Sequence, residues 1–323
     1  MCTAITYKGE NFYFGRNLDY DHSFGETVIL MPRNYDIKTS SLKPLGASYA
    51  VLGMGCVASG FPLFFDAINE AGLCCAGLNF VGNAFYQKPS ATKCNVAQYE
   101  FIPWLLARCA NVFEAEKAIL KINLTDSAFS ENMPPAQLHW LIADKERCIT
   151  LEVSKSGTQI HENPVGILTN NPPFPFQMFA LNNYAGLSPS NPNPTFGNIN
   201  LNLYSRGMGA LGLPGDYSSQ SRFIKAAFVK LNSKPQKTES CAVNQFFHIL
   251  SSVEQPEGCC ITEKGGYEKT IYSSCCNADK GIYYYKTYEN FGICAVDMHR
   301  ENLNSKDLIT YPIRKNQKIL WEK

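Results

Sequence analysis

Residues 1–19 read MCTAITYKGENFYFGRNLD, and this stretch decides how the chain folds. β-branched and aromatic residues lie on both sides of a turn at residues 8–11, where Gly and Asn occur. That pattern predicts a β-hairpin. With the turn centred between residues 9 and 10, Cys2 lies opposite Asn17 at the open end of the hairpin.

Two charged residues accompany the thiol at this end of the hairpin. Arg16 and Asp19 come to the end of the strand that carries Cys2. Cys is small enough for Met1 to be removed after synthesis, which leaves Cys2 with a free α-amine. An α-amine has a pKa of about 7.7 to 8.0, so at neutral pH it can accept the proton of the thiol. Nucleophile and base then belong to one residue.

Both features also have simpler explanations. A small Cys in a first strand is more often buried packing than a nucleophile. Charges next to a strand are commonly part of a solvated turn. The two features together favour catalysis, because a cation beside a thiol lowers its pKa and a carboxylate can orient an amine.

Composition limits the class of protein. The 323 residues are 45% hydrophobic and 18% charged, which is ordinary for a globular protein of one large or two ordinary domains. A net charge of +1 argues against nucleic acid and against an anionic membrane as partners. No apolar run approaches the roughly 20 residues of a membrane span, and the polar start lacks a signal peptide. We therefore expect a cytoplasmic protein.

The chain has thirteen cysteines, three pairs of which are adjacent in sequence: Cys74-Cys75, Cys259-Cys260 and Cys275-Cys276. Neighbours in a strand point to opposite faces of the sheet and bridge poorly. No Cys-x-x-Cys motif occurs, which disfavours zinc and redox sites. We expect mostly small core residues, kept reduced in a cytoplasm.

Strands and helices alternate in blocks along the chain. Beyond the hairpin, strands are expected over residues 26–32, 49–54, 73–80, 138–143, 148–153, 158–161, 166–169, 270–275, 281–288, 292–298 and 308–311. Helices are expected over 96–109, 111–120, 221–231 and 243–252, the second capped by Asn111 with Glu114. Residues 61–65 form an aromatic cluster, either core or a loop that walls a pocket, and residues 170–216 form a long loop. This order suits two stacked sheets with helices outside, in one domain.

Five short motifs together resemble the choloylglycine hydrolase family, which holds bile salt hydrolases and penicillin V acylases. They are Met1-Cys2-Thr3, Phe14-Gly15-Arg16-Asn17-Leu18-Asp19, Gly77-Leu78-Asn79-Phe80, Leu168-Thr169-Asn170-Asn171-Pro172 and Ser221-Arg222-Phe223. The match runs from residue 2 to about residue 312. The resemblance implies the four-layer αββα fold of N-terminal nucleophile hydrolases, as a single domain over residues 1–323 with Met1 removed on maturation. No nucleotide fingerprint or metal motif occurs in the sequence, so we expect no cofactor and no metal.

The resemblance also implies roles for six residues. Cys2 attacks an amide carbon and forms a thioester, while its α-amine moves the proton. Arg16 and Asp19 hold and tune this N-terminus, Asn79 and Asn170 build the oxyanion hole, and Arg222 matches the last family position. From the residues alone, both Asn side chains are turn formers at strand ends, and Arg222 is an exposed arginine in the first turn of a helix.

The same resemblance favours a conjugated bile acid as substrate. Bile salt hydrolases resemble this chain in having Asn at position 79, where penicillin V acylases tend to have Tyr. Positions that line the steroid pocket in relatives are occupied by Leu18, Phe24, Phe65, Phe129 and Met133, all of which are equally explained as core residues. Arg206 occupies a place that relatives use to distinguish the headgroup, and it suits the sulfonate of taurine or the carboxylate of glycine.

Other interpretations stay open. A penicillin V acylase or an acyl-homoserine lactone acylase would use the same mechanism with a different pocket. A non-enzymatic bile acid binder would need a blocked N-terminus or the loss of one of the residues that act with Cys2. Asn171 replaces a small residue usual after Asn170, Phe65 is bulkier than its usual counterpart, and a chain that keeps Met1 is an inactive precursor. Relatives suggest a homotetramer whose long loop reaches a neighbour. Acyl transfer to other amines is not decided by the sequence.

Overall fold

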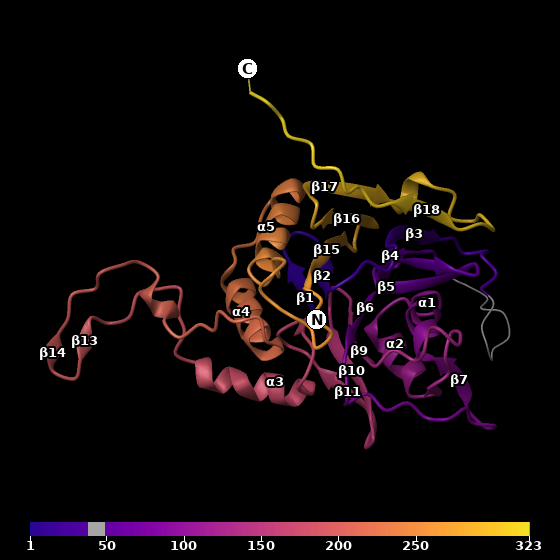
Figure 1. The fold of residues 1–323 in the computed structure, drawn as a ribbon, viewed down its shortest axis with the longest axis horizontal. Coiled ribbons are helices and arrows are strands. Elements are labelled where there is room, and N and C mark those ends of the chain that lie inside the picture. Colours follow the sequence, from indigo (N-terminus) through magenta and orange to yellow (C-terminus); the bar gives the residue numbers. More distant parts are fainter. Residues whose placement is uncertain (38–48, 323) are drawn as a thin grey trace.

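Two β-sheets stack face to face, with helices covering the outer face of each (Figure 1). The computed structural model describes residues 1–37 and 49–322. Its layers run helix, sheet, sheet, helix, which confirms the αββα arrangement expected from the sequence. The N-terminus lies in the middle of the molecule, where it can be surrounded by both sheets (Figure 1).

All neighbouring strands of both sheets are antiparallel. The six-stranded sheet has the order β12 (Ile167–Leu168), β1 (Cys2–Lys8), β2 (Phe12–Tyr20), β15 (Lys269–Asn277), β16 (Ile282–Thr287), β17 (Asn290–Asp297). The eight-stranded sheet has the order β11 (Gly157–Glu162), β10 (Cys148–Ser154), β9 (Leu138–Ala143), β6 (Cys74–Asn79), β5 (Phe61–Asn69), β4 (Val51–Ala58), β3 (Thr27–Met31), β18 (Ile309–Pro312).

The helices divide between the two outer faces. Helix α1 (Phe101–Leu106) packs on the eight-stranded sheet beside α2 (Val112–Ile119), while α4 (Ser219–Asn232) and α5 (Glu239–Ser251) pack on the six-stranded sheet. Helix α3 (Phe174–Ala180) contacts α4. Two small ribbons complete the fold: β7 (Cys94–Ala97) with β8 (Ile122–Thr125), and β13 (Thr195–Phe196) with β14 (Ile199–Asn200). Within the described residues, no helix combines the length and the apolar character of a membrane span.

Strand periodicity separates the apolar core into two parts. Cys74 belongs to the part that contains β1, β2 and the α4–α5 face, whereas Cys75 belongs to the part under α1 and α2. This confirms that these adjacent cysteines point to opposite faces of their strand. Cys259 and Cys260 lie outside the strands, and all thirteen thiols are free.

The register of the N-terminal hairpin differs from the prediction by one residue. Cys2 pairs with Leu18, and Asn17 pairs with Thr3, so the predicted Cys2–Asn17 pair is wrong. The turn holds three residues between Lys8 and Phe12, which moves its centre to residue 10. Because side chains alternate between faces, this register puts Cys2 on the face that carries Arg16 and Leu18.

Two further expectations are corrected by the structure, and one open alternative is decided. The cluster at residues 61–65 is part of β5, and its Phe61, Leu63 and Phe64 belong to the buried core, which confirms the core alternative. The loop expected at 170–216 contains α3 and the β13–β14 ribbon. The helix expected over 96–109 is reduced to α1, because residues 94–97 pair with β8 instead. Other expected strands and helices occur within a few residues of their predicted ranges. The cap of α2 is confirmed, since Asn111 Oδ1 accepts the backbone N–H of Glu114 at 2.9 Å.

Close pairing of β2 with β15 predicts a specific sensitivity at Gly15. A Cβ atom at Gly15 would stand 2.0 Å from the backbone oxygen of Ser274, so Gly15→Ala has to push the two strands apart. We expect the free energy of unfolding, measured by urea denaturation, to fall by about 2 kcal/mol or more. Gly186→Ala is the matched control, since a Cβ there meets nothing within 4 Å. Equal stability of the two variants would contradict the tight pairing.

Candidate active site

Three segments that are distant in sequence meet at Cys2. The residue is buried at the start of β1, and its backbone N–H donates to Asn170 Oδ1 at 2.8 Å. Arg222, in the first turn of α4, is also buried and donates from Nη1 to the Cys2 carbonyl oxygen and from Nη2 to Asn170 Oδ1, the latter at 2.8 Å. The interpretation of Arg222 as an exposed helix arginine is therefore wrong.

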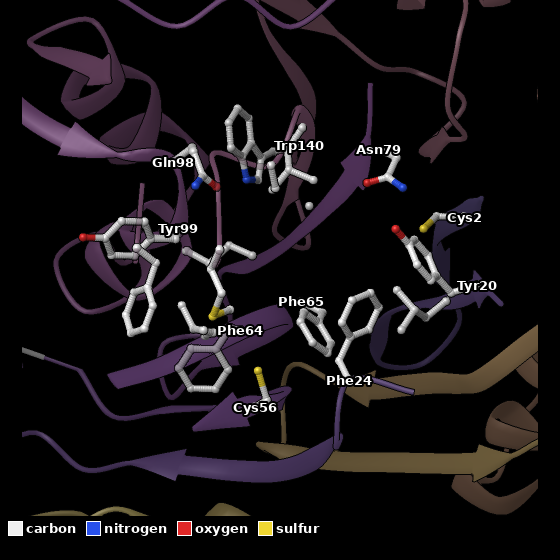
Figure 2. Close-up of a pocket in the computed structure, with 18 of the residues that line it drawn as sticks. Cys2, Tyr20, Phe24, Cys56, Phe64, Phe65, Asn79, Gln98, Tyr99 and Trp140 are labelled. Atoms are coloured by element: carbon white, nitrogen blue, oxygen red, sulfur yellow. The ribbon is translucent and has the colours of Figure 1, made fainter. Parts of the chain in front are cut away.

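The two asparagines also lie together, with different partners. Asn170 Nδ2 donates to the backbone oxygen of Asn79 at 2.9 Å, so every polar atom of the Asn170 side chain has a partner. Asn79 ends β6 and projects its side chain beside Cys2 (Figure 2). Asn171 is exposed and donates to the backbone oxygen of Val81 at 2.8 Å. The structure thus places Asn170, and not Asn171, against Cys2.

Asp19 is fully buried next to Arg222. Its Oδ2 lies 3.8 Å from Arg222 Nη1, and its Oδ1 accepts the hydroxyl of Thr270 at 2.6 Å. Burial raises the pKa of Asp19, and the positive charge of Arg222 opposes that rise. A β-bulge at Ile271 in β15 brings Thr270 opposite Asp19, because the strand pairing shifts by one residue there.

Arg16 occupies the same buried centre from β2. Its Nη1 donates to the backbone oxygens of Phe65, at 3.1 Å, and Gly77. Phe65 is the extra residue of a second bulge, between β4 and β5, which frees its carbonyl from the ladder. Burial lowers the pKa of the Arg16 guanidinium. Cys2 and nearby acidic groups, Asp66 among them, raise this pKa by more, so the net shift is upward.

The Met1 amine lies in a polar niche beside Asp19. It donates to the backbone oxygen of Asp19 at 2.6 Å and forms an ion pair with Glu268. Burial lowers the pKa of this amine. Met1 therefore fills the space directly next to the Cys2 nitrogen.

An apolar cavity of about 220 Å³ opens in front of Cys2 (Figure 2). Cys2 and Asn79 lie at one end of it, and Arg16 is also among its lining residues. The five residues predicted to line a steroid pocket also line it: Leu18, Phe24, Phe65, Phe129 and Met133. The rings of Phe65 and Phe24 contact each other in its wall, with centroids 5.7 Å apart. Arg206 is exposed in the segment that carries β13 and β14, and it does not line this cavity.

A buried imidazole links the two asparagine-bearing segments. His139 on β9 stacks on Phe80, which follows Asn79, with ring centroids 4.3 Å apart. Its Nε2 lies 2.9 Å from the backbone oxygen of Thr169, which precedes Asn170, and its Nδ1 lies 3.1 Å from Glu152 Oε1. His139 therefore helps to set the separation of Asn79 and Asn170.

Sequence reasoning missed the polar residues that support this centre. They are Asp66, His139, Glu152, Glu268 and Thr270, each contributed by a strand or strand end outside the quoted motifs. A usable signal existed for Asp66, a lone carboxylate within the apolar run FPLFFDAIN of β5. In residues 1–37 and 49–322, no group of three His, Cys, Asp or Glu side chains is arranged to hold a metal ion.

Comparison with known proteins gives consistent similarities. Residues 2–311 match the family model described as linear amide C–N hydrolases, choloylglycine hydrolase family. The chain is 52% identical over 315 residues to a bile salt hydrolase/transferase of Lactiplantibacillus plantarum, with 97% of each protein covered. A crystal structure of a mutant conjugated bile acid hydrolase from Clostridium perfringens superposes with a TM-score of 0.94 at 37% identity, covering 100% of each chain.

A more distant structure supports the fold alone. Penicillin V acylase from Agrobacterium tumefaciens superposes with a TM-score of 0.76 at 19% identity, covering 96% of this chain and 91% of that one. Together, these similarities identify the αββα architecture as that of N-terminal nucleophile hydrolases.

The buried His139–Glu152 pair generates a testable prediction. His139→Leu removes one of the two imidazoles that face the buried Glu152 carboxylate and leaves the Thr169 carbonyl oxygen without its partner. His161 Nε2 remains 3.7 Å from Glu152 Oε2, so we expect the free energy of unfolding to fall by about 1 to 3 kcal/mol. His248→Leu, on the exposed face of α5, is the control and should have little effect. Adding Glu152→Gln to His139→Leu removes the buried charge but keeps an oxygen for the Phe174 backbone N–H, so it should restore part of the loss in urea denaturation. A double variant less stable than the single variant would contradict this account.

Proposed function

The chain belongs to the choloylglycine hydrolase family of linear amide C–N hydrolases, and from that premise we propose that it cleaves the amide bond of glycine- or taurine-conjugated bile acids. The observation that carries the proposal is the position of Cys2 at one end of an apolar cavity. An apolar wall suits a steroid body, and the polar groups beside Cys2 suit an amide and its headgroup. The relatives named as bile salt hydrolases add support.

The reaction starts once Met1 has been removed. The free α-amine of Cys2 takes the thiol proton, and the thiolate attacks the amide carbon to form a tetrahedral intermediate. As the C–N bond breaks, the ammonium returns its proton to the leaving amine, which leaves a thioester on Cys2. The amine then takes a proton from water, whose oxygen attacks the thioester, and release of the bile acid regenerates the thiol.

Each neighbouring residue has a role that its contacts support. Asn170 and Arg222 fix the backbone of Cys2 by hydrogen bonds to its nitrogen and carbonyl oxygen. Asp19 follows Leu18, which is the strand partner of Cys2. Its carboxylate accepts a hydrogen bond from the free α-amine of Cys2 and orients it. Arg16 lines the same cavity as Cys2 and interacts with it electrostatically. Asn79 is the side-chain donor best placed to hold the oxyanion, while the Asn170 amide nitrogen donates to the Asn79 backbone when Met1 is present.

The headgroup and the assembly are linked in this proposal. The ribbon of β13 and β14 extends from the body of the protein (Figure 1) and exposes large apolar side chains, namely Phe196, Ile199, Leu201 and Tyr204. Large exposed apolar groups on a protruding segment are typical of an interface. We propose a cytoplasmic homotetramer in which this segment reaches a neighbouring subunit. Arg206 would then meet the headgroup of a substrate bound by that neighbour.

A substrate panel tests the function. With Met1 absent by intact mass, we expect amine release from taurocholate or glycocholate to be faster than from penicillin V. Cys2→Ser should lose at least about a hundredfold in rate, because a hydroxyl has a far higher pKa than a thiol and its proton is harder to remove. Cys56→Ser, which changes a thiol farther along the same cavity, is the control and should retain turnover.

The panel separates the alternatives. Fastest cleavage of penicillin V or of an acyl-homoserine lactone would keep the mechanism and overturn the substrate. A processed protein that binds bile salts but releases no amine would overturn the enzyme and favour a binding protein.

Thr270 offers a test of the role of Asp19. Activity needs the charged carboxylate in this proposal, so it should be lost as the pH falls through the pKa of Asp19. The Thr270 hydroxyl lowers this pKa, against the rise caused by burial. Thr270→Val should therefore move the acid limb of the pH profile of kcat/KM to higher pH.

Thr287→Val is the matched control, because its hydroxyl lies near Arg314 instead of Asp19. Identical acid limbs for the wild-type protein and Thr270→Val would contradict the role assigned to Asp19.

A further inference from the structure

The far part of the cavity contains hydrogen-bonding groups that the proposed chemistry does not use. Most of its wall is apolar, but Gln98 and Trp140 also line it. Figure 2 draws both on the side of the cavity away from Cys2, with the indole nitrogen and the carboxamide at its margin. Neither residue belongs to the motifs that carry the family resemblance.

Trp140 presents a donor without a partner. The side chain is 0% exposed, and Nε1 has no hydrogen-bond partner among the described residues. Trp140 on β9 pairs with Gly77 on β6, and a Cβ atom at Gly77 would stand only 3.3 Å from this Nε1. Gly77 has no side chain, so no Cβ atom covers this edge of the indole, and both residues line the cavity. A buried N–H group that lacks a partner is unfavourable unless something else accepts from it.

Gln98 supplies the complementary group. It begins the short 3-10 turn Gln98–Glu100 between β7 and α1, and its side chain is only 4% exposed. A carboxamide both donates and accepts hydrogen bonds, whereas an indole nitrogen only donates. A hydroxyl group also donates and accepts, so it can receive the indole N–H and give its own proton to the carboxamide oxygen.

We propose that Gln98 and Trp140 recognise a hydroxyl group on the ring system of the substrate, so that the cavity selects bile acids by their hydroxyl pattern. This inference rests on the proposed function, since it assigns the far end of the same cavity. A site built to hydrogen-bond a hydroxyl discriminates against the analogue that lacks it, because its buried polar groups are then left unpaired.

The chain offers a matched control for the indole. Trp104 in α1 is 4% exposed, and its Nε1 likewise has no partner among the described residues. Trp104 does not line the cavity. Trp140→Phe and Trp104→Phe therefore remove the same buried N–H group, one at the cavity and one away from it.

The experiment measures kcat/KM for the taurine conjugates of cholate, deoxycholate, lithocholate and 5β-cholanate, which carry three, two, one and no ring hydroxyls. The proteins are wild type, Gln98→Leu, Trp140→Phe and Trp104→Phe. We expect Gln98→Leu and Trp140→Phe to lower the ratio of kcat/KM for at least one hydroxylated conjugate to that for the 5β-cholanate conjugate by about tenfold, roughly the loss of one hydrogen bond. Trp104→Phe should leave every ratio unchanged.

Turnover of the 5β-cholanate conjugate shows that each variant is folded and competent. Ratios that stay unchanged in both cavity variants, while the wild-type protein cleaves conjugates, would overturn the inference and leave the proposed function intact. A wild-type protein that cleaves none of these conjugates would instead overturn the proposed function.

Discussion

The structure depends on the hydrogen bonds of one buried guanidinium. Arg222 donates to the Cys2 carbonyl oxygen, to the Thr3 hydroxyl at 2.6 Å and to Asn170 Oδ1 at 2.8 Å. These contacts join α4, the first strand and the segment that follows β12. Planar guanidinium groups hold several acceptors in fixed directions, which a flexible ammonium does less well. The position of Cys2 relative to both asparagines follows from this arrangement.

The charge balance around Arg222 explains why the centre tolerates burial. Arg16 and Arg222 are both nearly inaccessible to solvent, as are Asp19 and Asp66. Asp66 accepts hydrogen bonds from Tyr283 at 2.7 Å and Ser274 at 2.9 Å. Buried charges are stable only when they are paired and hydrogen-bonded, and removal of one partner costs several kcal/mol in general. The centre is therefore a single coupled unit, and the Met1 amine in the niche beside Asp19 is part of it.

Much of this could be predicted from the sequence, but not its fine geometry. Local patterns predict most strands and the outer helices, and the family motifs assign Cys2, Asn170 and Arg222 to one site. The predicted hairpin register is wrong by one residue. Both strands are apolar on both faces, so their hydrophobic pattern does not show how many residues the turn contains. The bulges at Phe65 and Ile271 also lie in strands whose hydrophobic pattern does not indicate an extra residue, so the sequence does not predict them. Long-range partners such as Glu268 have no local signal at all, since only the fold brings them to the N-terminus.

The central claim is that Cys2 carries the acyl group during catalysis. The most direct test is to mix the Met1-free protein with a conjugated bile acid, quench with acid, and locate the added mass by peptide mapping. We predict one bile acyl group per chain on the N-terminal peptide, at Cys2, and none on the fraction that retains Met1. An acyl group on any of the other twelve cysteines, or turnover without any acyl-protein, would contradict the account.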